Sequence, residues 1–191
     1  MSEEISAGHP YPAEPSAWVR RFLPLVAPGG KVLDYACGAG RHARLFAARG
    51  YRVVAVDRSA EALATLAGEP RIEPRCEDLE EGPWPLAGEL FDAVVVTNYL
   101  YRPRLRELLA CVAPGGALIY ETFMQGNERF GRPSNPEFLL RPGELLGSLG
   151  TDFAVLAFEQ GVVERPKAAV VQRVCAVRRP ADSTALPAAA E

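Results

Sequence analysis

Apolar and polar positions alternate between residues 31 and 57 in a way that predicts two strands joined by a turn and a helix. The sequence there is KVLDYACGAGRHARLFAARGYRVVAVD. It begins with an apolar run of strand length, and Gly38 and Gly40 then supply a turn at little steric cost. Helical spacing follows from His42 and ends at Gly50, a residue typical of helix ends. The mostly β-branched run VVAV predicts a strand buried on both faces, which ends at Asp57.

The rest of the chain repeats this alternation of strands and helices. A helix is expected after Ser16, and the run FDAVVVT (Phe91–Thr97) is the strongest strand signal. Residues 79–90 hold either a very short helix or only a loop. Two further strand-like runs, at 151–164 and 168–178, read as a hairpin. The pattern therefore predicts an α/β fold, a Rossmann-like, doubly wound and mostly parallel sheet with a C-terminal antiparallel hairpin.

Length and composition limit this fold to one domain. With 191 residues, we expect a flexible arm at 1–14, a folded domain at 15–178 and a disordered tail at 179–191. The net charge of −3 gives no reason to expect nucleic-acid or membrane binding. Four separated cysteines form no CxxC pair, so neither a metal site nor a disulfide framework is expected. The N-terminus lacks an apolar core, and we expect a soluble, cytoplasmic protein.

The glycine turn matches the G-x-G-x-x-G/A pattern of nucleotide-binding units, with Ala43 in the last position. This pattern alone allows NAD, FAD or S-adenosylmethionine. Asp34 separates these ligands, because a carboxylate within the strand would be unfavourable beside a pyrophosphate but suits a cationic ammonium or sulfonium group. Asp57 is placed to accept hydrogen bonds from ribose hydroxyls. Further along the chain, the segment Glu77-Asp78-Leu79 offers a carboxylate to an adenine amino group.

Together these segments resemble the successive motifs of class I S-adenosylmethionine-dependent methyltransferases. The similarity lies in VLDYACGAGRHARLFAARGYRVVAVDRS, CEDL, FDAVVVTNYLYRP and LLACVAPGGALIYETF, and covers residues 16–178. The glycine turn and the single-domain size are similar to those of small bacterial methyltransferases of the tellurite-resistance and thiopurine type. The resemblance implies S-adenosyl-L-methionine as cofactor, bound by the following residues: Asp34, Gly38, Gly40, Asp57, Arg58, Asp78, Leu79, Asn98 and Tyr99.

No catalytic residue is identified, because a soft nucleophile needs none for methyl transfer. An oxygen or amine acceptor would need a base, and the weak candidates are Tyr101, Glu121 and Glu128. Tyr101 stands where many relatives carry histidine. His42 is interpreted as a surface residue at a helix start. The segment Gly126–Asn135 is a candidate lid over the acceptor, whose deletion should abolish turnover and spare cofactor affinity.

The two-residue spacing of Arg102, Arg104 and Arg106 scatters them around a helix, so they are interpreted as a solvated face. We expect no added domain for recognising RNA or protein. The expected activity is methyl transfer to a small-molecule acceptor. A non-catalytic S-adenosylmethionine-binding module or partner subunit is the alternative, and an NAD-dependent oxidoreductase is less favoured because of Asp34. The oligomeric state and the acceptor atom are left open.

Overall fold

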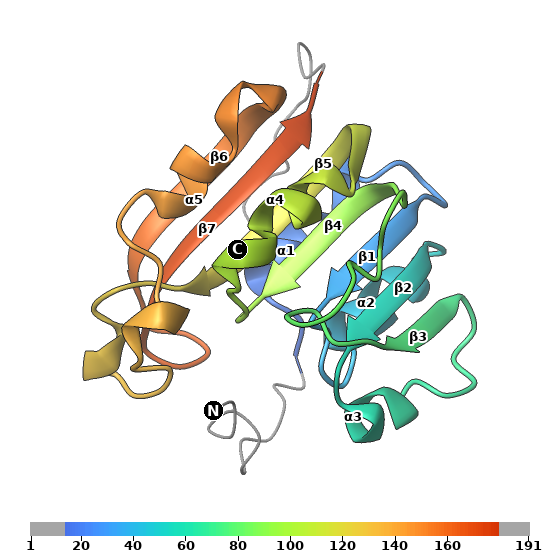
Figure 1. Cartoon of the computed structure of the whole chain (residues 1–191), viewed down its shortest axis with the longest axis horizontal. Helices are drawn as coiled ribbons and strands as arrows, with labels where there is room; N and C mark the ends of the chain where they lie inside the picture. Colours follow the sequence, from blue (N-terminus) through green and yellow to red (C-terminus); the bar gives the residue numbers. More distant parts are fainter. Residues whose placement is uncertain (1–13, 180–191) are drawn as a thin grey trace.

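The computed structural model describes residues 14–179. The expected arm and tail lie outside the described residues, apart from Glu14 and Arg179. One mixed sheet of seven strands has the order β3-β2-β1-β4-β5-β7-β6 (Figure 1). The strands are β1 (Lys31–Tyr35), β2 (Arg52–Asp57), β3 (Ile72–Cys76), β4 (Phe91–Thr97), β5 (Val112–Phe123), β6 (Phe153–Val163) and β7 (Ala169–Arg178).

Strands β1 to β5 are parallel, and β7 pairs antiparallel with both β5 and β6. The predicted fold class and the C-terminal hairpin are therefore confirmed. The strand order reverses between β1 and β4, because β1 is followed by β2 on one side while β4 lies on the other. Ligands of open α/β sheets bind at such a switch point, beyond the carboxyl ends of the strands.

Helices cover both faces of the sheet. One apolar cluster joins a sheet face to α1 (Ala17–Phe22), α2 (Arg41–Ala47) and α3 (Ala60–Ala64). The other joins the opposite face to α4 (Leu105–Ala110), α5 (Glu144–Ser148) and the segment 79–90. Five short 3-10 helices complete the described residues: η1 (Leu23–Leu25), η2 (Arg102–Arg104), η3 (Asn127–Arg129), η4 (Pro136–Phe138) and η5 (Gly150–Asp152).

The segment between β3 and β4 is a loop, which settles the open choice for residues 79–90. Its apolar side chains nevertheless cover this face of the sheet, as those of a helix would. Leu79 and Leu86 are buried in the core, and Trp84 packs against it. The loop therefore closes this face of the sheet without regular structure.

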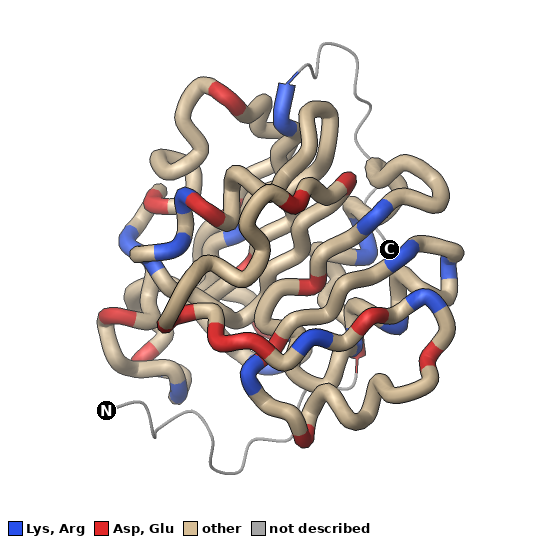
Figure 2. The backbone as a smooth tube through the Cα atoms, turned by 45° about the vertical axis from the view of Figure 1, so that its right-hand side comes forward, with Lys and Arg blue, Asp and Glu red and all other residues tan. Residues whose placement is uncertain are grey.

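Lys and Arg residues are interspersed with Asp and Glu residues along the backbone (Figure 2). The expectation that Arg102, Arg104 and Arg106 form a solvated face is wrong for two of them. Arg102 binds Glu144 through its Nε at 2.6 Å and donates to two backbone carbonyls. Arg104 pairs with Glu107 and also binds the Gly82 carbonyl, whereas Arg106 is exposed. Through these contacts η2 joins the segment before α5 to the loop between β3 and β4.

Within residues 14–179, no helix is long and apolar enough to cross a membrane. The same residues contain no grouping of three or more His, Cys, Asp or Glu side chains that would hold a metal ion.

Candidate functional site

The glycine turn after β1 forms the floor of the site. Gly38 and Gly40 have φ angles of 55° and 74°, in the left-handed region that glycine adopts without strain. A Cβ on Gly40 would lie 2.6 Å from the Leu66 side chain, so this glycine also allows the turn after α3 to pack closely. Ala36 adopts a φ of 53° without being glycine. Such strained positions concentrate at functional sites.

Asp57 is bonded directly to this turn. Its Oδ2 accepts the Gly38 N–H at 2.8 Å, and its Oδ1 accepts the Ser59 N–H at 2.9 Å. Each carboxylate oxygen has two lone pairs, so one acceptor position on each oxygen is left for a ligand hydroxyl. The carboxylate is half-buried at the end of β2. The structure therefore places Asp57 and the two glycines in one unit, as the sequence predicts.

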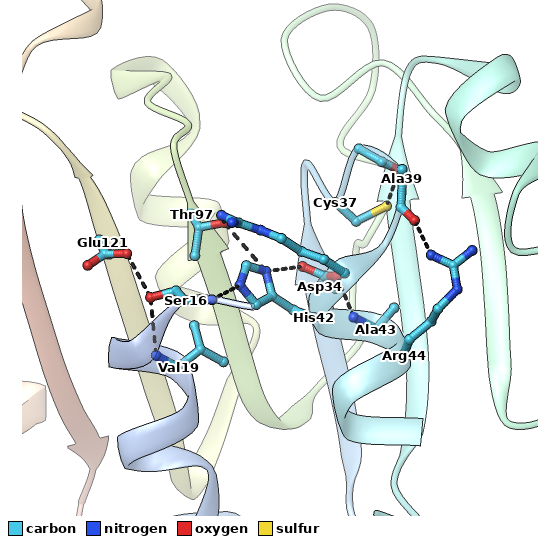
Figure 3. Close-up of polar contacts among 12 residues, drawn as sticks. Ser16, Val19, Asp34, Cys37, Ala39, His42, Ala43, Arg44, Thr97 and Glu121 are labelled. Carbon is cyan, nitrogen blue, oxygen red and sulfur yellow. Dashed lines mark hydrogen bonds and ion pairs between the residues drawn. The ribbon is translucent and has the colours of Figure 1, made fainter. Parts of the chain in front are cut away.

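Asp34 is 2% exposed and lies behind the turn. Its Oδ2 accepts the Ala43 N–H at 2.8 Å, and its Oδ1 lies 3.9 Å from His42 Nδ1 (Figure 3). Burial raises the pKa of Asp34 to about 7, against the opposing effects of the Ala43 bond and the Arg41 charge. The carboxylate thus stabilises the first turn of α2, and it is an ionisable group buried in an apolar interior.

The residues expected beside the adenine lie next to one another at the edge of the sheet. Asp78 and Arg58 are exposed, and Leu79 is buried. Backbone N–H groups of Glu80 and Glu81, and then the Arg58 charge, lower the pKa of Asp78. Asp78 is therefore ionised and retains carboxylate lone pairs for a donor.

The loop after β4 is bonded to the end of β5. Asn98 is exposed with a φ of 57°, and its N–H donates to the Glu121 carbonyl at 2.9 Å. The Tyr99 hydroxyl donates to Glu80 at 3.3 Å. The Tyr99 ring meets the Tyr35 ring edge-to-face, 5.5 Å between centroids. Tyr99 thus links this loop to the acidic loop that carries Asp78.

The three candidate bases occupy different surroundings. Glu121 at the end of β5 accepts the Ser16 hydroxyl at 2.7 Å and pairs with Arg173 at 3.4 Å. Glu128 is exposed and accepts the Gly126 N–H within its own loop. Tyr101 is half-buried at the start of η2. The Glu121 carboxylate is thus bonded to two side chains, and the Glu128 carboxylate to the backbone of its own loop.

The prediction that His42 is a surface residue is wrong, because it is 1% exposed. Its Nε2 accepts the Ser16 N–H at 3.1 Å (Figure 3). The sequence carried a signal for this burial, since His42 lies three and four positions before Leu45 and Phe46 and shares their helix face. Ser16, which bonds both His42 and Glu121, is a further residue at this place that the sequence does not predict.

Residues 32–116 match a family described as a methyltransferase domain. A search of curated proteins found no match. Among solved structures, TehB from Haemophilus influenzae superposes with a TM-score of 0.71 at 19% identity, over 86% of this chain and 63% of that one. This chain therefore spans less than two thirds of that protein.

Two other solved structures show how widely the fold is used. The N-methyltransferase NodS from Bradyrhizobium japonicum has a TM-score of 0.63 at 18% identity, over 84% of this chain and 94% of its own. The [4+2]-cyclase SpnF has the same TM-score and identity, over 84% of this chain and 78% of its own. At these identities the likeness establishes the fold alone.

Proposed function

We propose that this chain, which has the fold of the class I S-adenosylmethionine-dependent methyltransferases and matches their methyltransferase domain, transfers a methyl group from S-adenosylmethionine to a small-molecule acceptor. The observation that carries the proposal is the position of Asp34. Its buried carboxylate lies behind the glycine turn at the point where the strand order reverses. A cationic ligand there stabilises the ionised carboxylate, whereas a pyrophosphate would repel it.

The residues present fit this cofactor. Asp57 retains acceptor positions for ribose hydroxyls, Asp78 and Leu79 offer a carboxylate and an apolar surface to the adenine, and Asp34 suits the ammonium end. When bound, the cofactor supplies an activated methyl group. The chain itself then has to orient the acceptor and exclude water, and such positioning can lower a barrier by about 7–11 kcal/mol.

No side chain of the site is assigned as general base. Glu121 is bonded to Ser16 and Arg173, and Glu128 to its own loop. This arrangement supports an acceptor that is nucleophilic without a strong base, such as a thiolate or another soft anion. Tyr101 stays the candidate for an acceptor that must lose a proton.

Calorimetry with S-adenosylmethionine, S-adenosylhomocysteine and NAD tests the proposal. We expect binding of the first two and none of NAD. Replacing Asp57 by Ala should weaken S-adenosylmethionine binding by about 1.5–3 kcal/mol, the range for hydrogen bonds to a charged group. Asp57→Asn is the matched control, since it keeps one oxygen for the turn and should lose less. Binding of NAD alone would overturn the proposal.

A non-catalytic binding module is the second candidate, and one observation favours it. Glu121 and Glu128, the two candidate carboxylate bases, are both already hydrogen-bonded within the protein. A screen with a labelled methyl group over thiol, oxyanion, amine and RNA acceptors separates the two candidates. Tight cofactor binding without transfer to any acceptor class would favour the module.

A further inference from the structure

Residues Glu14–Ser16, called the strap here, lie across the carboxyl ends of β1, β4 and β5. The Ser16 N–H donates to His42 Nε2 at 3.1 Å, and the Ser16 hydroxyl donates to Glu121 at 2.7 Å. The Arg41 guanidinium donates to the Glu14 carbonyl at 2.8 Å and to the Thr97 hydroxyl at 3.4 Å. Three side chains therefore hold the strap, and the contacts of His42 and Glu121 with Ser16 are seen in Figure 3.

The bond from Ser16 fixes the chemical state of His42. A ring nitrogen that accepts an N–H carries no proton, so the proton of the neutral imidazole lies on Nδ1. Nδ1 faces Asp34 Oδ1 at 3.9 Å and Thr97 Oγ1 at 3.5 Å. Burial, with the charges of Arg41 and Arg20, lowers the pKa of His42 to about 3. The ring therefore stays neutral and can accept.

This geometry joins the strap to the charge on Asp34. If Asp34 Oδ1 carries a proton, its O–H faces the Nδ1–H of His42, so that two donors oppose each other. This is avoided only if the imidazole proton moves from Nδ1 to Nε2. At Nε2 that proton would face the Ser16 N–H. Besides His42, the charged groups acting on Asp34 are Arg41 from α2 and Asp57 from β2, and Arg20 from α1 acts on His42. An ionised Asp34 is thus the state that favours the closed strap.

We infer that His42 is a positioning residue, which holds the strap as one wall of the cofactor site and couples its closure to the ionised carboxylate of Asp34. This inference rests on the proposed function, because the bound cationic cofactor is what keeps Asp34 ionised. Glu121 has a related role at the same strap residue, Ser16. Its carboxylate holds Ser16 instead of taking a proton from an acceptor.

Two substitutions at one position isolate the bond to His42. Ser16 has φ −55° and ψ 137°, which proline also adopts. Ser16→Ala and Ser16→Pro both lack the hydroxyl, and only Ser16→Pro lacks the N–H that His42 accepts. By calorimetry we expect Ser16→Pro to bind S-adenosylmethionine about tenfold more weakly than Ser16→Ala, the scale of leaving one buried acceptor unpaired.

Variants at His42 provide the second test. Gln places an oxygen near the position of Nε2 and should keep the Ser16 contact, whereas Leu fills similar volume without an acceptor. We expect His42→Gln to bind nearly as the wild type does. His42→Leu, which keeps the Ser16 hydroxyl, should bind about tenfold more weakly than the wild type, the same factor that separates Ser16→Pro from Ser16→Ala. Hydrogen exchange of the Ser16 amide should be slow in the wild type, slower with S-adenosylmethionine, and fast in His42→Leu.

The outcomes separate this inference from the proposed function. Equal affinities of folded Ser16→Ala and Ser16→Pro would overturn the inference alone. So would a Ser16 amide that exchanges fast in the wild type, or a loss of protection in His42→Leu with no loss of affinity. Failure of the wild type to bind S-adenosylmethionine would overturn the proposed function, and with it the coupling to the cofactor.

Discussion

At the residue scale, the carboxylate of Asp34 combines a structural contact with a place at the candidate site. It bonds the Ala43 N–H at 2.8 Å, as a structural group would, and it lies at the switch point of the sheet. Spacing alone predicts Asp34 and Asp57 as site residues because strands and a glycine turn place them. It does not predict the neutral, buried His42, since a histidine at a helix start is compatible with solvent as well.

Asp34 should give the protein a measurable pH dependence of stability. Burial raises its folded pKa from 3.8 to about 7. The folded state therefore binds the Asp34 proton more tightly than the unfolded state does. The contribution of Asp34 to the free energy of unfolding is full below about pH 4 and is lost as the pH rises to about 7. The scale is about 1.4 kcal/mol per unit of pKa shift.

Urea unfolding of the wild type and Asp34→Asn at pH 5 and pH 8 measures this effect. Asparagine keeps an oxygen for the Ala43 N–H and does not titrate. We expect the variant to gain stability relative to the wild type between pH 5 and pH 8. An equal difference at both pH values would show that Asp34 does not titrate in this range.

At the scale of elements, the segment between β5 and α5 is more firmly attached than the predicted lid would be. Asn127 is 2% exposed, and its amide bonds the Val170 N–H at 3.1 Å and the Pro133 carbonyl at 3.0 Å. Arg102 holds two carbonyls of the same segment. Such anchors could not be predicted because they join residues that lie far apart in sequence. Deleting Gly126–Asn135 would therefore remove fold contacts as well as a lid.

Substitutions at the exposed tip test the acceptor role without removing the anchor. Phe130 and Arg132 are exposed, so the double variant Phe130→Ala/Arg132→Ala should leave the free energy of unfolding within about 0.5 kcal/mol. We expect slower methyl transfer with unchanged S-adenosylmethionine affinity, measured by the labelled-methyl screen and calorimetry. Asn127→Ala is the contrasting variant and should lose about 1–3 kcal/mol of stability. Unchanged transfer by the double variant would exclude the tip from acceptor binding.

For the whole molecule, the order of elements could be read from the sequence because buried strands and amphipathic helices differ in period. The strand Phe91–Thr97 and the final hairpin are where the pattern places them. The packing of the hairpin against the parallel strands also depends on side-chain contacts, which the hydrophobic periodicity does not predict. Arg173 in β7 pairs with Glu121 in β5 at 3.4 Å and with Glu159 in β6 at 3.6 Å.

Arg173 also lies over the Trp18 ring, 5.3 Å from its centroid, so one guanidinium joins three strands and α1. Methionine at this position keeps much of the packing and removes the charge, which leaves Glu121 with Ser16 as its remaining partner. We expect Arg173→Met to lower the free energy of unfolding by about 1–3 kcal/mol, the penalty for a polar group that loses its partner. In a double-mutant cycle, Glu121→Gln should recover part of that loss, because it removes the unpaired charge and keeps an acceptor for Ser16. Additive losses in urea unfolding would show that the two residues are not coupled, and that the hairpin is held to the parallel strands by the strand pairing and the apolar core alone.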